Sequence, residues 1–187
     1  MHPPIDSKLP RVGTTIFTVM SRLAAEHGAI NLSQGFPDFE PPERLLDLAS
    51  HHMRKGGAGN QYAPLAGLPS LRQAIAAKVF EYYGRTVDPD NAVTVTSGGT
   101  EALFCAVQAV VRAGDEVILL DPAYDSYEPA VELAGGRAVH VPLQRPDFGI
   151  DWQRLCDALT PRTRLLIVNF PHNPTGATLA PADLEQL

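Results

Sequence analysis

Two short apolar runs constrain the fold of this chain more than any other feature. They cover residues 117–120 (Val-Ile-Leu-Leu) and 165–168 (Leu-Leu-Ile-Val), and neither has polar residues alternating with the apolar ones. A strand with one face in water alternates polar and apolar residues, whereas a strand of a parallel sheet covered by helices on both faces does not. The two runs therefore predict an α/β protein with a mostly parallel sheet in three α/β/α layers.

The pattern of residue types along the chain changes near residue 69. Before that point it is rich in turns, with one helix expected over residues 42–55. After it, a helix that starts at Pro69 and stops at Gly84 opens a regular alternation. Strands are expected over 92–96, 116–120, 137–142 and 164–170, separated by helices over 100–113, 126–134 and 151–159.

Composition excludes several classes of protein. The 187 residues carry 15 Lys+Arg and 21 Asp+Glu, and a formal charge of -6 argues against nucleic acid as the main partner. The apolar runs are too short to span a membrane, and no secretory signal is recognisable, so a cytoplasmic protein is expected. Cys105 and Cys156 lie in apolar settings and are expected in the core, with no metal site.

The carboxyl ends of the expected strands are where a ligand should bind, because ligands of open parallel sheets bind at that edge. The first strand leads into Ser97-Gly-Gly-Thr100, which opens a helix. Gly98 and Gly99 would allow a ligand close to the backbone, and the helix start attracts anions. The segment is either a phosphate cradle or a tight turn with Thr100 as a helix cap, and it matches neither a P-loop nor a dinucleotide fingerprint.

Two further strand ends carry candidate ligand-binding side chains. Tyr124 and Tyr127 follow the second strand, where they would either stack on a planar ligand or pack in the core. The fourth strand ends in Asn169-Phe-Pro-His-Asn-Pro-Thr-Gly176. Asn173 is expected to be extended because it precedes a proline, and it is either part of a plain turn or an amide donor for a phenolate oxygen. His172 is interpreted as a turn residue, not as a base.

Taken together and in this order, the motifs resemble those of the class I and II aminotransferases, which bind pyridoxal 5′-phosphate (PLP) on the fold-type I scaffold. The resemblance covers nearly the whole chain and includes residues 32–37 (Leu-Ser-Gln-Gly-Phe-Pro) and the Tyr-x4-Gly-x3-Leu-Arg block of residues 62–72. The amino-acid sequence of these motifs is similar to that of the methionine aminotransferases and of the kynurenine or glutamine aminotransferases. The resemblance implies that residues 1–44 form an arm and part of a small domain, and that residues 45–187 form the first part of a large PLP-binding domain.

The resemblance also implies roles for single residues. Gly98, Gly99 and Thr100 would hold the cofactor phosphate, and Tyr124 would stack on the pyridine ring. Asn173 would bond the ring's 3′ oxygen, with Asn169 as a second candidate.

Two more roles come from the resemblance alone. Gly35 would offer its N–H to the substrate carboxylate. Tyr62 would reach the phosphate of a neighbouring subunit in a homodimer with shared active sites. The substrates would be an amino acid of methionine, aromatic or glutamine-like type and a 2-oxo acid.

The catalytic lysine of the family has no counterpart in this sequence. PLP chemistry needs a Schiff-base lysine and an acidic partner for the ring nitrogen. Lys8, Lys55 and Lys78 are the chain's only lysines, and none follows a strand in a Ser-x-x-Lys setting. The sequence is therefore expected to be the N-terminal portion of an aminotransferase that is inactive alone. A PLP-dependent C–S lyase and a non-catalytic protein of the same fold remain as alternatives.

Overall fold

The computed structural model describes residues 6–35 and 37–187. The chain divides into two compact units: Thr14–Thr96, and Ser97–Leu187 together with the residues up to Gly13. The expected domain boundary at residue 44 stays a prediction. No helix among the described residues is long and apolar enough to cross a membrane.

The unit Thr14–Thr96 consists of helices and extended segments. Its elements are α1 (Ile16–Glu26), α2 (Glu43–Lys55), the short 3-10 helix η1 (Gly57–Asn60) and α3 (Pro69–Tyr83). The ends of α3 follow from sequence chemistry, because Pro69 occupies its first turn and Gly84 ends it in the left-handed conformation at φ 64°. The N–H of Gly84 donates to the carbonyl of Phe80 at 2.8 Å.

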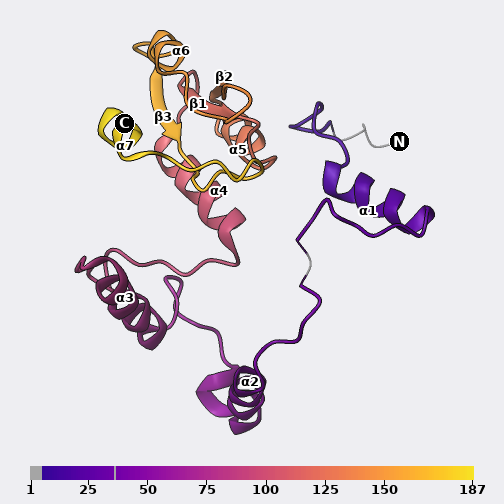
Figure 1. Ribbon diagram of the computed structural model, residues 1–187. Helices are drawn as coiled ribbons and strands as arrows, with labels where there is room; N and C mark the ends of the chain where they lie inside the picture. Colours follow the sequence, from indigo (N-terminus) through magenta and orange to yellow (C-terminus); the bar gives the residue numbers. More distant parts are fainter. Residues whose placement is uncertain (1–5, 36) are drawn as a thin grey trace, which may run out of the picture. The chain divides into compact units, whose positions relative to one another are not determined.

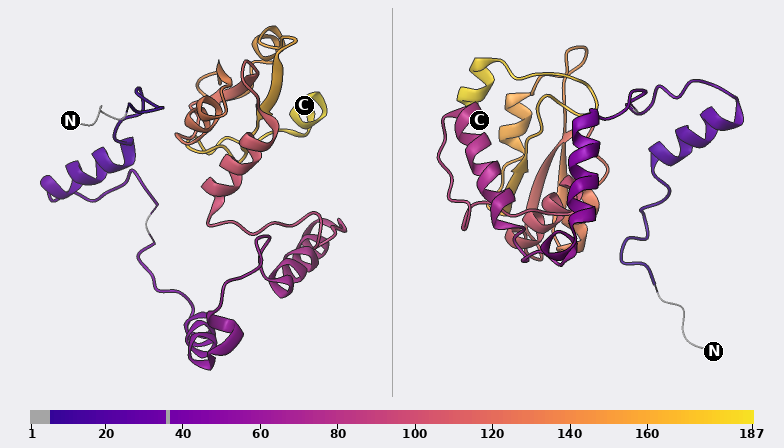
Figure 2. Two further views of the ribbon diagram at one scale, coloured as in Figure 1. Left: turned by 180° about the vertical axis from the view of Figure 1, so that it is seen from behind. Right: turned by 90° about the horizontal axis from the view of Figure 1, so that it is seen from below.

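The second unit contains the sheet and its covering helices (Figures 1 and 2). Three parallel strands lie in the order β2-β1-β3, so β1 is central. This arrangement confirms the expected α/β class with a parallel sheet. The elements in chain order are α4 (Gly99–Val110), β1 (Glu116–Asp121), α5 (Tyr127–Leu133), β2 (Arg137–Pro142), α6 (Trp152–Asp157), β3 (Thr163–Ile167) and α7 (Pro181–Gln186).

The side chains of β1 alternate between two hydrophobic clusters. Val117 and Leu119 pack with residues of α4 and α5 on one face of the sheet. Ile118 and Leu120 pack on the other face with a cluster that includes Leu155 of α6. All four side chains are at most 4% exposed, so covering both faces explains the unbroken apolar run.

A buried carboxylate organises the amino end of β1. Glu116 is 1% exposed and accepts hydrogen bonds from Arg137 Nη2 at 2.7 Å, from Thr160 Oγ1 at 2.7 Å and from Arg162 Nη2 at 2.6 Å. These bonds lower the pKa of Glu116 to about 2, and the bond from Arg137 contributes most to that shift. Because Arg137 begins β2 and Arg162 immediately precedes β3, the carboxylate ties all three strands together at this end.

One expected strand is wrong. Residues 92–96 are extended but form no strand in the described structure, where the sheet has three strands. The N–H of Val95 donates to the carbonyl of Ala66 at 3.0 Å, but the segment belongs to no ladder of the described sheet. An apolar segment forms a strand only if a neighbouring strand pairs with it. The sequence pattern of the segment does not show whether such a neighbour exists.

The expectation that both cysteines are buried is also wrong. Cys105 and Cys156 are exposed free thiols. Each lies one or two positions from a residue of the same helix that is buried: Val107 in α4 and Leu155 in α6. Apolar neighbours in sequence do not fix which side of a helix a residue occupies.

Replacing Glu116 with Gln should destabilise the second unit because Arg137 and Arg162 lose their shared anion. The carboxyl pKa is lower in the folded chain than its ordinary value of 4.5. The wild-type advantage is therefore complete above about pH 4.5 and disappears as the pH falls through about 2. Urea unfolding followed by circular dichroism at a series of pH values measures the difference in the free energy of unfolding between the wild type and Glu116→Gln. The exposed Glu185 provides a matched control, Glu185→Gln, which should leave stability unchanged; equal stability of wild type and Glu116→Gln at pH 7 would contradict the account.

Candidate functional site

A pocket of about 340 Å³ lies where the start of α4 meets the segments that follow β1 and β3. Every residue that lines it belongs to the second unit. The lining residues are Gly99, Thr100, Leu103, Tyr124, Tyr127, Asn169 and Asn173. We call this the strand-end pocket.

The start of α4 gives the pocket its backbone donors. Gly98, the N-cap residue, has φ 90° and ψ 167° and offers no side chain to cap the helix. The first N–H groups of a helix have no carbonyl partners within it and carry the positive end of its dipole. The loop before the helix is fixed by the Ser97 N–H, which donates to the Glu101 carboxylate. The helix start therefore suits an anion.

Two tyrosines, Tyr124 and Tyr127, line the pocket. The sequence leaves open whether each stacks on a ligand or packs in the core, and the structure distinguishes the two rings. Tyr127 is 9% exposed and belongs to the core cluster, where burial raises the pKa of its phenol while a hydrogen bond with Asn169 opposes this. Tyr124 is half-buried, and its ring meets that of Tyr127 edge-on at 5.7 Å between centroids. Tyr127 is thus a core ring that holds Asn169, and Tyr124 is the more exposed of the two rings.

Two asparagines from the segment after β3 complete the lining. Asn169 comes two residues after the end of β3 and is half-buried, whereas Asn173 is exposed. Both side chains border the pocket. Amide groups at fixed positions can donate to an anionic oxygen without adding charge.

The pocket combines neutral donors with aromatic surface. The lining residues carry backbone N–H groups, three hydroxyls and two side-chain amides, and no lysine or carboxylate is among them in the part of the chain that the structure describes. This set suits a planar ring that carries a phosphate and a phenolate oxygen. The described residues also contain no group of three or more His, Cys, Asp or Glu side chains that could hold a metal ion.

Two site residues suggested by the resemblance lie in the unit Thr14–Thr96. Tyr62 is fully exposed after η1, and Gly35 is exposed in an extended segment. Phe36, part of the same motif, lies outside the described residues. The roles of Tyr62 and Gly35 stay predictions.

Sequence reasoning missed Leu103 as a lining residue and treated Tyr127 only as one of two equivalent rings. The spacing of Gly99, Leu103 and Val107 at i, i+4 and i+8 places Leu103 on the same helix face as a pocket residue and a core residue. That periodicity was the available signal for Leu103. No signal in the sequence distinguishes Tyr124 from Tyr127, because the distinction depends on how α5 packs.

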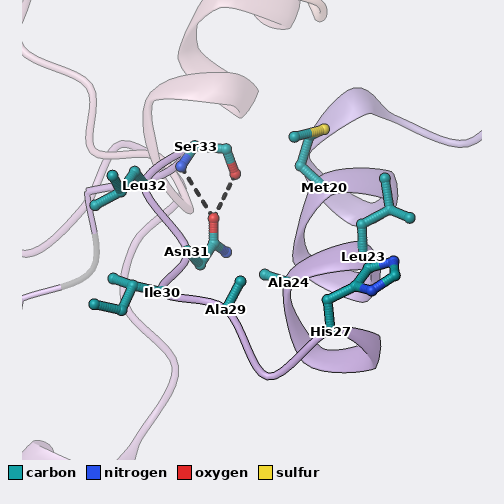
Figure 3. Close-up of a pocket in the computed structure, with 9 residues that line it drawn as sticks. All are labelled: Met20, Leu23, Ala24, His27, Ala29, Ile30, Asn31, Leu32 and Ser33. Carbon is teal, nitrogen blue, oxygen red and sulfur yellow. Dashed lines mark hydrogen bonds between the residues drawn. The ribbon is translucent and has the colours of Figure 1, made fainter.

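A second pocket, within the unit Thr14–Thr96, is mainly apolar (Figure 3). Met20 and Leu23 of α1, and His27 directly after it, line the pocket together with residues of the segment that follows. In that segment Ser33 donates its N–H and its hydroxyl to the Asn31 side-chain oxygen, at 3.0 Å and 2.6 Å. Its lining differs from that of the strand-end pocket, which combines a helix start with two tyrosines and two asparagines.

The fold and the strand-end pocket define a class of protein that comparison with known proteins identifies. Residues 27–187 match the family model for aminotransferase class I and II, and the chain belongs to this family. The family uses PLP.

Individual relatives are similar over nearly the whole chain. Methionine aminotransferase of Escherichia coli is 53% identical over 97% of this chain and 46% of its own length. Human kynurenine–oxoglutarate transaminase 1 is 41% identical over 88% of this chain and 42% of its own. The crystal structure of an E. coli methionine aminotransferase superposes with a TM-score of 0.92 and 52% identity, covering 98% of this chain and 48% of that one. The chain thus spans about half the length of the relatives it matches.

Alanine at the two adjacent glycines should have opposite effects on stability. At neither position would a Cβ meet an atom within 4 Å, so space is not the difference. Gly98 has φ 90° and ψ 167°, a region open essentially to glycine alone, and Gly98→Ala should cost about 1–3 kcal/mol. Gly99 is helical, and Gly99→Ala should be neutral or stabilise by about 0.5–1 kcal/mol. Urea unfolding of both variants measures the difference, and equal destabilisation would contradict the assigned backbone conformation.

Proposed function

We propose that this chain supplies the cofactor-binding part of a PLP-dependent aminotransferase. The protein would transfer an amino group from a methionine-like, aromatic or glutamine-like amino acid to a 2-oxo acid. The observation that carries the proposal is that Gly99, Thr100, Tyr124, Asn169 and Asn173, each expected at a cofactor site, line one pocket. The methionine and kynurenine specificities of the relatives support the proposed substrate class.

The start of α4 would hold the cofactor phosphate. The N–H groups of Gly99 and Thr100 and the Thr100 hydroxyl would donate to its oxygens, and Gly98 would keep the approach free of side chains. A helix dipole contributes about 0.3–2 kcal/mol to an anion at this position, and each charge-assisted hydrogen bond adds about 1.5–3 kcal/mol.

The remaining pocket residues would orient the ring. The half-buried ring of Tyr124, which lines the pocket, would stack on the pyridine, and its edge-on contact with Tyr127 would restrain its rotation. Asn173 would donate its amide to the ring's 3′ oxygen. Asn169, held by the phenol of Tyr127, would be a second donor to the same oxygen.

PLP supplies an electron sink that withdraws electrons from the substrate α-carbon once the amino acid is bound to it. The chain's own residues would bind and orient the cofactor. A lysine is needed to move the proton, and Lys8, Lys55 and Lys78 are all exposed and outside the strand-end pocket. Lys78 instead lies 5.6 Å from the ring centre of Tyr82 on the same helix. We therefore propose that the chain alone does not transaminate.

Two alternatives share the pocket. A PLP-dependent C–S lyase would use the same phosphate and ring contacts but release ammonia without a 2-oxo acid. A non-catalytic protein would bind PLP without catalysing a reaction. The names of the relatives favour the aminotransferase.

The phosphate assignment is tested by Gly99→Asp, which places a carboxylate at the start of α4. PLP affinity should fall at least tenfold because charge-assisted hydrogen bonds are lost and two anions repel. Gly149→Asp is the matched control, since Gly149 also faces open space but lies outside the pocket. Fluorescence titration with PLP measures both variants. Equal affinity of Gly99→Asp and Gly149→Asp would sink the assignment.

The absence of a catalytic lysine predicts no turnover by the 187-residue chain. Incubation with PLP, methionine and a 2-oxo acid should give no amino-group transfer. Borohydride reduction followed by peptide mapping should find no stoichiometric label on Lys8, Lys55 or Lys78. Turnover that depends on the 2-oxo acid, together with stoichiometric labelling of one lysine, would show that the chain is complete for catalysis.

A shared site in a homodimer predicts complementation. Tyr62→Phe and Gly99→Asp subunits each form homodimers in which both phosphate sites are damaged. A mixed dimer should hold one site with both lesions and one with neither, so it should recover about one tight PLP site per dimer. Titration of co-purified, differently tagged subunits measures this number. If mixed dimers form and recover no tight site, Tyr62 does not act across the interface.

A further inference from the structure

The segment after β3 makes a compact turn around Asn173. Its base is closed by two short backbone bonds: His172 N–H to the Ala177 carbonyl, and Gly176 N–H to the His172 carbonyl, each at 2.7 Å. Asn173 lies within this turn and borders the strand-end pocket. The conformation of the turn therefore decides where the Asn173 amide points.

A side-chain bond crosses the turn directly beside Asn173. His172 Nδ1 lies 2.8 Å from Thr175 Oγ1. The same Oγ1 accepts a bond from the N–H of Ala177 at 3.3 Å, so its own proton is available to His172. Asn173 and Pro174 are the two residues between the bonded pair. Thr175 lines a neighbouring pocket with Pro174 and Phe148, and not the strand-end pocket.

The histidine that makes this bond is buried. His172 is 5% exposed, and its ring lies 5.5 Å from that of Phe170. Burial lowers the pKa of His172, and a smaller opposing effect comes from a hydrogen bond with the Leu120 backbone. Leu120 belongs to β1, so a neutral imidazole connects the central strand to the turn.

We propose that His172 and Thr175 form a brace that positions the Asn173 amide. The amide would then bond to the hydroxyl oxygen on the ring of a phosphorylated hydroxypyridine. His172 is fixed to β1, Thr175 is fixed to His172, and Asn173 is held between them. Neither side chain of the brace touches the ligand. They are positioning residues for its recognition, an inference that rests on the proposed function of the strand-end pocket.

The Thr175 variants test the brace with little disturbance of the core, whereas substitution of the buried His172 risks unfolding. Thr175→Val removes the hydroxyl and keeps the shape. Thr175→Ser keeps the hydroxyl and serves as the rescue variant. In the ligand-free, isotope-labelled chain, nuclear magnetic relaxation of the Asn173 side-chain amide should show increased mobility in Thr175→Val and wild-type order in Thr175→Ser. Identical relaxation in all three proteins would overturn the brace.

Binding then shows whether the brace acts through Asn173. The probe is 4′-deoxypyridoxine 5′-phosphate, which keeps the phosphate and the ring hydroxyl but has no aldehyde to react with lysines. Thr175→Val should weaken its binding about threefold to tenfold, the loss of one hydrogen bond, and Thr175→Ser should restore it. Combined with Asn173→Ala, Thr175→Val should cause no further loss. Full additivity of the two substitutions would contradict the proposal.

The relaxation measurement and the binding measurement together distinguish a failure of this inference from a failure of the proposed function. If the wild-type chain does not bind the probe, the proposed cofactor site fails, and the relaxation of the Asn173 amide still decides whether the brace exists. If the probe binds and Thr175→Val changes neither relaxation nor affinity, the site stands and the brace is wrong.

Discussion

The central strand β1 is buried on both faces, and this constraint decides where chemistry can occur in the second unit. Its four apolar residues occupy two clusters, one against α4 and α5 and the other against α6. No polar group can face either layer without losing its hydrogen bonds to water. The polar side chains of β1, Glu116 and Asp121, are thus confined to its two ends, and the two ends are used differently.

The amino end carries the bonds that join the strands, and the carboxyl end carries the candidate site. Glu116 pairs with Arg137 and Arg162 at the amino end. At the other end the start of α4, the half-buried ring of Tyr124 and two asparagines face a pocket. Glu116 and the ligand-binding groups of the strand-end pocket thus lie at opposite ends of the strands. A substitution at Glu116 should therefore change stability without altering the donors of the pocket.

Sequence patterns predicted those features that depend on local chemistry or on periodicity. The run 117–120 identified β1, Pro69 and Gly84 marked the ends of α3, and the order of motifs identified the family. Five of the cofactor residues expected from the resemblance line one pocket, although their roles stay proposals. These successes share a cause: each rests on residues whose backbone preferences or burial are set nearby in the chain.

The failures depend on partners that a pattern does not name. Residues 92–96 have the composition of a strand, but a strand exists only beside another one. Cys105 was expected in the core, yet it lies on the exposed side of α4. The His172–Thr175 bond was equally hidden, because a histidine in a turn gives no indication that it is buried against Leu120. Tertiary packing, and not local propensity, decides all three.

The central claim is that the strand-end pocket binds a phosphorylated pyridine through the start of α4. The most direct measurement is a two-dimensional NMR titration of the isotope-labelled chain with PLP. The account predicts saturable shifts that are largest at the backbone amides of Gly99 and Thr100 and at the side-chain amides of Asn169 and Asn173. Shifts confined to the surroundings of Lys8, Lys55 and Lys78, where the aldehyde reacts without a site, would contradict it.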